Sequence, residues 1–113
     1  MEIRQFMKGI NFIREVIHKD IAFPQLTIFL IVAENEGITQ GELADRLKLP
    51  KGTVSRNVIK LGDLLVQDSK GVWKQKGYDL VKQIPDSHDP RASACHLTNH
   101  GKSVYSALKK AIK

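Results

Sequence analysis

The residues whose chemistry is easiest to assign lie in one short stretch, LPKGTVSRNVIKL, residues 49–61. Three of its apolar residues recur at helical spacing, and the positions between them are polar or basic. Hydroxyl groups and a guanidinium are donors that suit base edges and phosphates. The stretch therefore predicts a half-polar helix presented to a polyanion, with an open side formed by Lys51, Thr53, Ser55 and Arg56.

The residues just before this stretch predict a second short helix that would hold it in place. Thr39 and Glu42 have the spacing of a capping box, in which each side chain satisfies a free amide of the other residue. A tight turn then leads to Pro50, which starts the next helix. Two short helices joined by a turn make the helix-turn-helix pattern over residues 39–61. A helical hairpin that serves only for packing is the alternative.

The positive charge of the chain is concentrated in its second half. Residues 1–50 hold six Lys/Arg and seven Asp/Glu, net −1, whereas residues 51–113 hold twelve and five, net +7. The excess begins where the quoted stretch begins. Nucleic acid is the commonest partner of such a surface. A solvated basic face that binds nothing is the other interpretation.

The length and composition allow one domain with one core over residues 1–113. The longest apolar run, 28–33, has six residues, whereas a membrane span needs roughly 20. The first residues lack the order of an export signal, and the single cysteine, Cys95, cannot form an internal disulfide. Both observations favour a cytoplasmic protein.

The remaining elements would frame the helix-turn-helix. The pattern predicts a helix over 2–19 whose continuous apolar face either folds back on the core or pairs with another chain. Pro24 begins a buried helix that Gly37 ends. Strands near 78–84 and 93–97 predict a hairpin, the wing, over 78–97. Thr98 is the expected N-cap of a final helix over 99–112.

The segment of residues 62–77 does not follow from these elements. Ile59 falls on the open side of the preceding helix, and Asn57 falls where an inward apolar residue is expected. We expect 62–77 to turn near Asp68 and to cover Ile59 with its apolar side chains. Trp73 is available for this contact or for stacking on a base, and we expect it to cover Ile59.

Two sequence patterns resemble one known family. The pattern ELA…L…TVSR…L runs from Glu42 to Leu61, and D-x-R-A…LT…G runs from Asp89 to Gly101. Together they resemble the winged helix-turn-helix core of the multiple antibiotic resistance regulator (MarR) family, over roughly residues 24–112. The chain departs from the family in 62–77, which exceeds the usual short turn before the wing, and at its carboxyl end, where relatives commonly have a longer helical pair.

The resemblance implies a mainly α fold with a small β-hairpin wing and about five helices. It also implies a dimeric DNA-binding transcription regulator, usually a repressor, whose recognition helix enters the major groove and whose wing reaches an adjacent minor groove. The homodimer would form through the N- and C-terminal helices, and a small-molecule effector is compatible with the family. Asp89 would orient the wing rather than touch DNA. We expect DNA contacts from Thr39, Gln40, Lys51, Gly52, Thr53, Ser55, Arg56, Lys60, His88 and Arg91.

Other chemistry finds little support in the sequence. No Ser/His/Asp arrangement, Gly-rich phosphate motif or converging pair of carboxylates is present, so we expect no enzyme. His96 and His100 are four apart, but Thr98 interrupts the helix between them, and we expect neither a metal nor a cofactor. We expect Cys95 to be an inert packing residue rather than an oxidant sensor.

Two rival functions stay open at this point. One is a winged-helix interaction module that blocks another regulator. In that case this protein would not bind duplex DNA at moderate salt. The other is a DNA binder of low specificity that acts in replication or packaging. It would have nearly the same affinity for an operator and a scrambled duplex.

Overall fold

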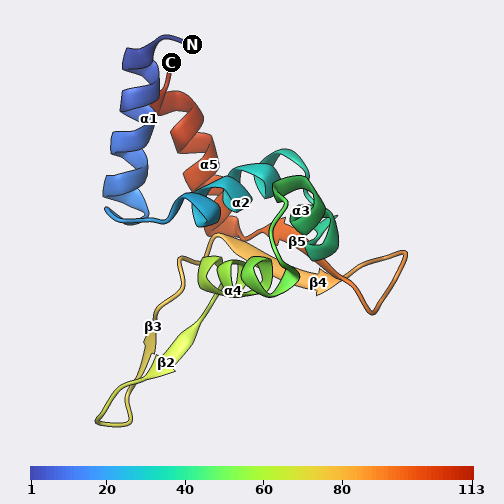
Figure 1. Cartoon of the computed structure of the whole chain (residues 1–113). Coiled ribbons are helices and arrows are strands. Elements are labelled where there is room, and N and C mark those ends of the chain that lie inside the picture. The colour runs from blue at the N-terminus through green and yellow to red at the C-terminus, as the bar shows by residue number, and fades with distance from the viewer.

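The computed structural model describes residues 1–113 and is mainly helical, with a small antiparallel sheet (Figure 1). The predicted fold class is therefore confirmed. None of the helices combines the length and the apolar composition that a bilayer span requires. The elements in chain order are α1 (Ile3–Val16), α2 (Phe23–Glu34), β1 (Ile38–Thr39), α3 (Gln40–Leu47), α4 (Lys51–Leu61), β2 (Leu65–Gln67), β3 (Trp73–Gln75), β4 (Val81–Pro85), β5 (Ser93–Leu97) and α5 (Asn99–Ala111).

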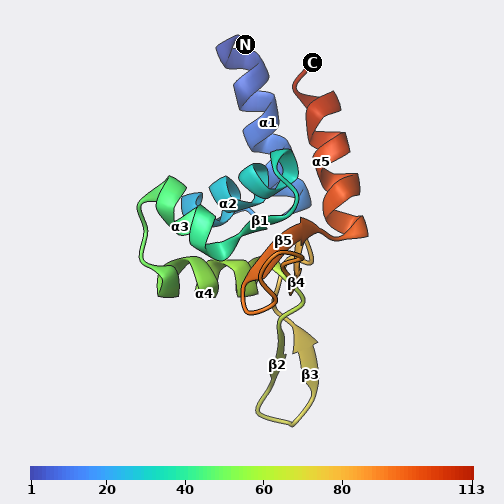
Figure 2. The same ribbon diagram turned by 90° about the vertical axis from the view of Figure 1, so that its right-hand side faces the viewer.

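The core forms around α2, as its nearly continuous apolar sequence predicts. Ile28, Phe29 and Val32 of this helix are buried and belong to one cluster with apolar residues of α3, α4, the sheet and α5. The helices α1 and α5 run antiparallel on the side of the molecule away from α4 (Figures 1 and 2). Both chain ends lie at that end of the structure.

The helix-turn-helix is held together by the capping contacts that its sequence predicts. The Thr39 hydroxyl accepts a hydrogen bond from the Glu42 amide at 3.1 Å, and the Glu42 carboxylate accepts one from the Thr39 amide at 3.2 Å. Lys48 ends α3 in the left-handed conformation, with φ +55°. Pro50 is the N-cap of α4 rather than its first helical residue. These contacts fix where α4 begins relative to α3.

The wing belongs to a three-stranded sheet in the order β1-β5-β4. β5 pairs antiparallel with β4 from Val81↔Leu97 to Pro85↔Ser93. On its other edge β5 pairs with β1, a strand of two residues that sequence patterning missed because it is too short to show alternation. Thr98 caps α5 as expected, since its hydroxyl accepts a hydrogen bond from the Gly101 amide at 2.9 Å.

A second hairpin follows α4: the predicted turn near Asp68 is confirmed, but the predicted cover over Ile59 is wrong. Residues 62–77 do not cover Ile59, which stays 45% exposed, and Trp73 is 63% exposed. Instead β2 and β3 pair with each other from Leu65↔Gln75 to Gln67↔Trp73 and project away from the body (Figures 1 and 2). The apolar residues of each strand are consecutive in the sequence, and consecutive side chains of a strand point to opposite faces, so they cannot form one covering face. A local bond accounts for the polar residue Asn57 at an inward position, because its side-chain amide donates to the Thr53 backbone carbonyl at 2.9 Å.

Candidate nucleic-acid interface

The outer face of α4 carries the polar groups that the sequence analysis singled out. Val54, Val58 and Leu61 bury one side of the helix in the core. Lys51, Gly52 and Arg56 are exposed on the other side, and Thr53 and Ser55 are half-buried beside them. The Arg56 guanidinium lies 3.4 Å from the Thr53 hydroxyl and forms no ion pair. No side chain caps the start of α4, and the Thr53 amide donates to the Pro50 carbonyl at 3.0 Å, which leaves the Lys51 and Gly52 amides for an anion.

A second cationic group stands at the tip of the wing. The Asp89 carboxylate accepts hydrogen bonds from the Arg91 amide at 3.1 Å and from Arg91 Nε at 3.3 Å. The Asp89 amide in turn donates to the Asp86 carboxylate at 3.1 Å. The Arg91 side chain is 92% exposed, and His88 is exposed beside it. Asp89 therefore holds the wing tip and the arginine stem without removing the guanidinium from solvent.

Three more of the predicted contact residues form bonds within the protein, besides Arg91 and the Arg56–Thr53 pair. The Thr39 hydroxyl caps α3. Gln40 donates to the Gln83 side chain on β4, a contact that joins α3 to the wing. The Lys60 ammonium donates to the Lys76 carbonyl at 2.6 Å and lies over the Tyr78 ring. A DNA contact by any of these groups would therefore share or replace an internal bond.

The reactive side chains away from α4 are held in structural positions. Cys95 is fully buried in β5, and burial raises the pKa of its thiol to about 11. This agrees with the packing role that the sequence predicts, because the thiolate is scarce at neutral pH. His96 lies on the same strand with its Nδ1 3.9 Å from the Glu36 carboxylate. That carboxylate also accepts the Leu97 amide at 2.8 Å, which ties the end of β5 to the loop after α2.

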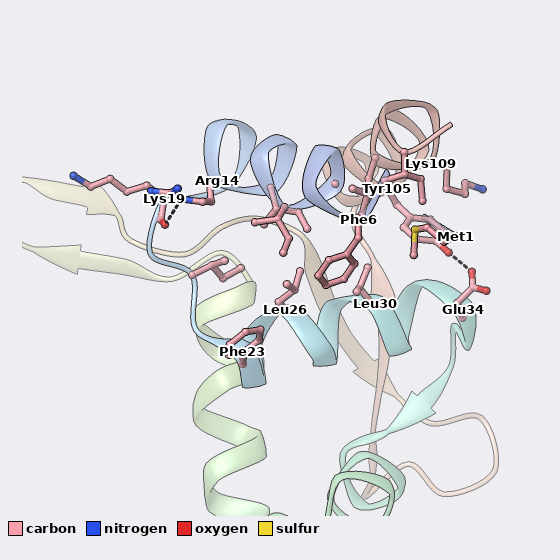
Figure 3. Close-up of a pocket in the computed structure, with 16 residues that line it drawn as sticks. Met1, Phe6, Arg14, Lys19, Phe23, Leu26, Leu30, Glu34, Tyr105 and Lys109 are labelled. Atoms are coloured by element: carbon pink, nitrogen blue, oxygen red, sulfur yellow. Dashed lines mark hydrogen bonds between the residues drawn. The ribbon is translucent and has the colours of Figure 1, made fainter. Parts of the chain in front are cut away.

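A cavity that the sequence analysis missed opens between α1, α2 and α5 (Figure 3). Its volume is about 500 Å³, and most of its lining residues are apolar, among them Phe6, Phe23, Leu26 and Leu30. The Tyr105 hydroxyl donates to the Glu34 carboxylate at its edge. That hydrogen bond raises the pKa of Tyr105 to about 12, with burial adding to the effect. Helical periodicity marked these residues as apolar but did not reveal the space between them.

Comparison with known proteins agrees with this geometry. The family model described as "MarR family" matches residues 19–62, from before α2 to the end of α4. A Bacillus subtilis (strain 168) protein, the uncharacterized HTH-type transcriptional regulator YybA, is 24% identical over 111 residues. The match covers 96% of this chain and 65% of the relative, so the chain spans about two thirds of the length of that protein.

Solved structures of MarR-family proteins are also similar to this chain. A MarR transcriptional regulator from Methanosarcina mazei Go1 is 26% identical with a TM-score of 0.64, over 96% of this chain and 69% of that one. The S. aureus MepR–DNA complex is 19% identical with a TM-score of 0.68, over 96% of this chain and 76% of that one. The fold and the site thus define a winged helix-turn-helix protein. Within that class, the chain is similar to proteins of the MarR family.

Proposed function

We propose that this chain binds double-stranded DNA sequence-specifically as a homodimer and represses transcription in the cytoplasm. It acts by occupying a promoter, not by catalysing a reaction. The proposal rests on the MarR-like fold and on the arrangement of α4 and the wing. The MepR relative, whose structure holds DNA, supports the same partner here.

The single observation that carries the proposal is that the cationic side chains of α4 and of the wing tip are exposed on the same molecule. Lys51, Arg56 and Arg91 are exposed, and neither Lys51 nor Arg56 forms an ion pair. A helix of this size fits the major groove of B-DNA, and a guanidinium suits the negative potential of a narrow minor groove. Gly52, Thr53, Ser55 and His88 lie beside these cations and complete the proposed contact set.

The proposed dimer uses the apolar face that α1 leaves in solvent. Ile3, Phe6, Met7 and Ile10 are exposed on this helix, which packs beside α5 at the end of the molecule away from α4. A contiguous exposed apolar face is typical of an association surface. A two-fold dimer would place two copies of α4 on one side of a duplex, about one helical turn apart.

The cavity between α1, α2 and α5 is where we propose that an effector binds. It combines a mainly apolar lining with Glu34, Tyr105 and Lys109, as small-molecule sites commonly do. Because it lies between the proposed dimer helices and α2, occupancy would alter the separation of the two α4 helices.

Selection of bound duplexes from a random pool, followed by sequencing, tests the proposed function. We expect enrichment of an inverted repeat whose half-sites are centred about one helical turn apart. No binding to any duplex at moderate salt would favour a protein-interaction module. Binding without enrichment, with a steep salt dependence, would favour a packaging or replication role.

A further inference from the structure

The base of the β2–β3 hairpin is fixed to the end of α4 by backbone contacts. The Tyr78 amide donates to the Lys60 carbonyl at 3.0 Å, and the Asp79 amide donates to the Gly62 carbonyl at 3.0 Å. The backbones meet so closely at the base that a Cβ on Gly77 would lie 2.0 Å from the Gly62 carbonyl oxygen. Together with the bond from Lys60 to the Lys76 carbonyl, these contacts fix the hairpin to the last turn of α4.

The hairpin exposes more apolar surface than its position in the monomer explains. Leu65, Val66, Val72 and Trp73 are all at least two fifths exposed. A two-stranded sheet without a packed face is only marginally stable in water. The exposed apolar side chains of the hairpin thus offer surface for a contact with another molecule.

The charges of the hairpin indicate the chemistry of that partner. The Asp68 carboxylate is used inside the turn: it accepts the Lys70 and Val72 amides at 2.8 and 2.9 Å, and it pairs with Lys74 at 3.5 Å. These bonds hold the pKa of Asp68 below its usual value, the Val72 amide foremost. Lys70 and Lys76 form no ion pair and are exposed. Asp63, at the base of the hairpin, is also exposed without an ion pair, so the free charges of residues 62–77 are two lysines and one aspartate.

The hairpin and the wing lie on opposite sides of α4. Figure 1 shows the wing tip to the right of α4 and the β2–β3 hairpin below it to the left. Figure 2 shows the hairpin extending beyond α4 on the side away from α1 and α5. A duplex placed against the outer face of α4 would therefore pass between the wing on one flank and the hairpin on the other.

We propose that the β2–β3 hairpin is a second DNA-contacting arm, which binds the duplex backbone on the flank of the α4 half-site opposite the wing. This inference rests on the proposed function. Lys70 and Lys76 contact phosphates, and Trp73 packs its ring against the sugar edge while its indole N–H faces a phosphate oxygen. A two-stranded ribbon of this kind is narrow enough to enter a groove of B-DNA. Such contacts add affinity for any sequence and leave base selection to α4.

The charge contribution is tested with the double variant Lys70→Ala/Lys76→Ala. Both side chains are exposed, and the internal bonds of these residues use only their backbone atoms. We expect the slope of log K against log salt to fall by about 2 per protomer, and affinity at moderate salt to fall roughly 10- to 30-fold on operator and scrambled duplex alike. The matched control, Lys8→Ala/Lys113→Ala, removes two exposed lysines at the opposite end and should leave both values close to wild type.

The position of the arm is tested by hydroxyl-radical footprinting. In one variant, residues 65–75 are replaced by Asn-Gly, a two-residue turn that joins Leu64 to Lys76, which face each other in the hairpin register. Circular dichroism and thermal unfolding verify that the core is intact. We expect this variant to lose protection on one flank of each half-site, and Arg91→Ala to lose it on the other.

The outcomes separate this inference from the function on which it rests. If the wild-type protein selects an inverted repeat while the hairpin variants keep its full footprint and salt slope, DNA contact by the hairpin is ruled out. The proposed function as a DNA-binding regulator then still stands. If the variants change self-association in sedimentation and leave the footprint unchanged, the hairpin is a protein contact. If the wild-type protein binds no duplex, both proposals are wrong.

Discussion

At the scale of single residues, the cationic side chains of α4 differ in the contacts that they form within the protein. Lys60 is held by the Lys76 carbonyl and the Tyr78 ring, whereas Arg56 has one long contact with the Thr53 hydroxyl. A guanidinium in this state needs little rearrangement to reach a base edge. Arg56 is thus the strongest candidate for sequence reading, and Lys60 supports the base of the hairpin.

We expect Arg56→Ala to weaken binding to the selected operator by about 1–3 kcal/mol and to relax preference at one base position in each half-site. The loss should be much smaller on scrambled duplex, because a base contact contributes only where the base is correct. Competition gel shifts with operator variants measure both quantities. Equal losses on both duplexes would instead assign Arg56 to a phosphate.

The buried thiol of Cys95 predicts a change of stability at alkaline pH. Its pKa is raised to about 11 in the folded protein from an ordinary value of 9.0. Between these values the unfolded chain loses the proton and the folded protein keeps it. The free energy of unfolding is therefore unaffected below about pH 9 and falls by up to about 1.4 kcal/mol per pH unit from pH 9 to 11.

Urea unfolding between pH 8 and 11 measures this slope. The Cys95→Ala variant is the control, because it is less stable throughout but retains every other titrating group. Its stability should decline less steeply over the same interval. Parallel curves for the two proteins would show that the thiol does not titrate as its burial requires.

At the scale of elements, two glycines show that the start of α5 is closely packed and the start of α4 is not. A Cβ on Gly101 would lie 2.1 Å from the Leu80 carbonyl oxygen, a backbone atom that cannot move aside cheaply. By contrast a Cβ on Gly52, in the first turn of α4, meets nothing within 4 Å. The start of α5 is thus fitted against the start of β4, whereas the start of α4 faces open space.

We therefore expect Gly101→Ala to destabilise the protein by about 3 kcal/mol or more through overpacking. Gly52→Ala should instead stabilise it by up to about 1 kcal/mol, since alanine has the better helix propensity. Chemical unfolding of the two variants and the wild-type protein measures the sign of each change in the free energy of unfolding. A neutral Gly101→Ala would mean that α5 can shift away from Leu80 without loss.

Short-range patterns predicted most elements, and long-range contacts explain what they missed. The capping residues Thr39 and Thr98 marked two helix starts, because each bond spans three residues. The link from Gln40 to Gln83 joins residues 43 apart, and no local pattern reports it. Residues 62–77 contain enough apolar side chains to cover Ile59, but alternation along each strand sends them to both faces. Spacing alone does not tell a covering segment from a free hairpin.

At the scale of the whole molecule, the distribution of exposed apolar residues predicts the oligomeric state. Ile3 is 71% and Met7 56% exposed, one turn apart on α1 and outside the cavity lining. We expect Ile3→Glu/Met7→Glu to weaken self-association at least about tenfold, since burying these carboxylates costs well over 1.4 kcal/mol. Sedimentation velocity over a range of concentrations measures this change.

The control for the dimer is Val72→Glu, which introduces the same charge at an exposed apolar residue of the hairpin. It should sediment as wild type does. Loss of the dimer in this variant would place the subunit contact at the hairpin rather than along α1.

The hairpin also carries an intrinsic fluorescent probe. Trp73 is the one tryptophan of the chain, and it stands in solvent away from the core. Its fluorescence therefore reports on the surroundings of the arm and is nearly silent to melting of the helices. A change in emission on adding a ligand, without any attached dye, identifies an event at this end of the protein.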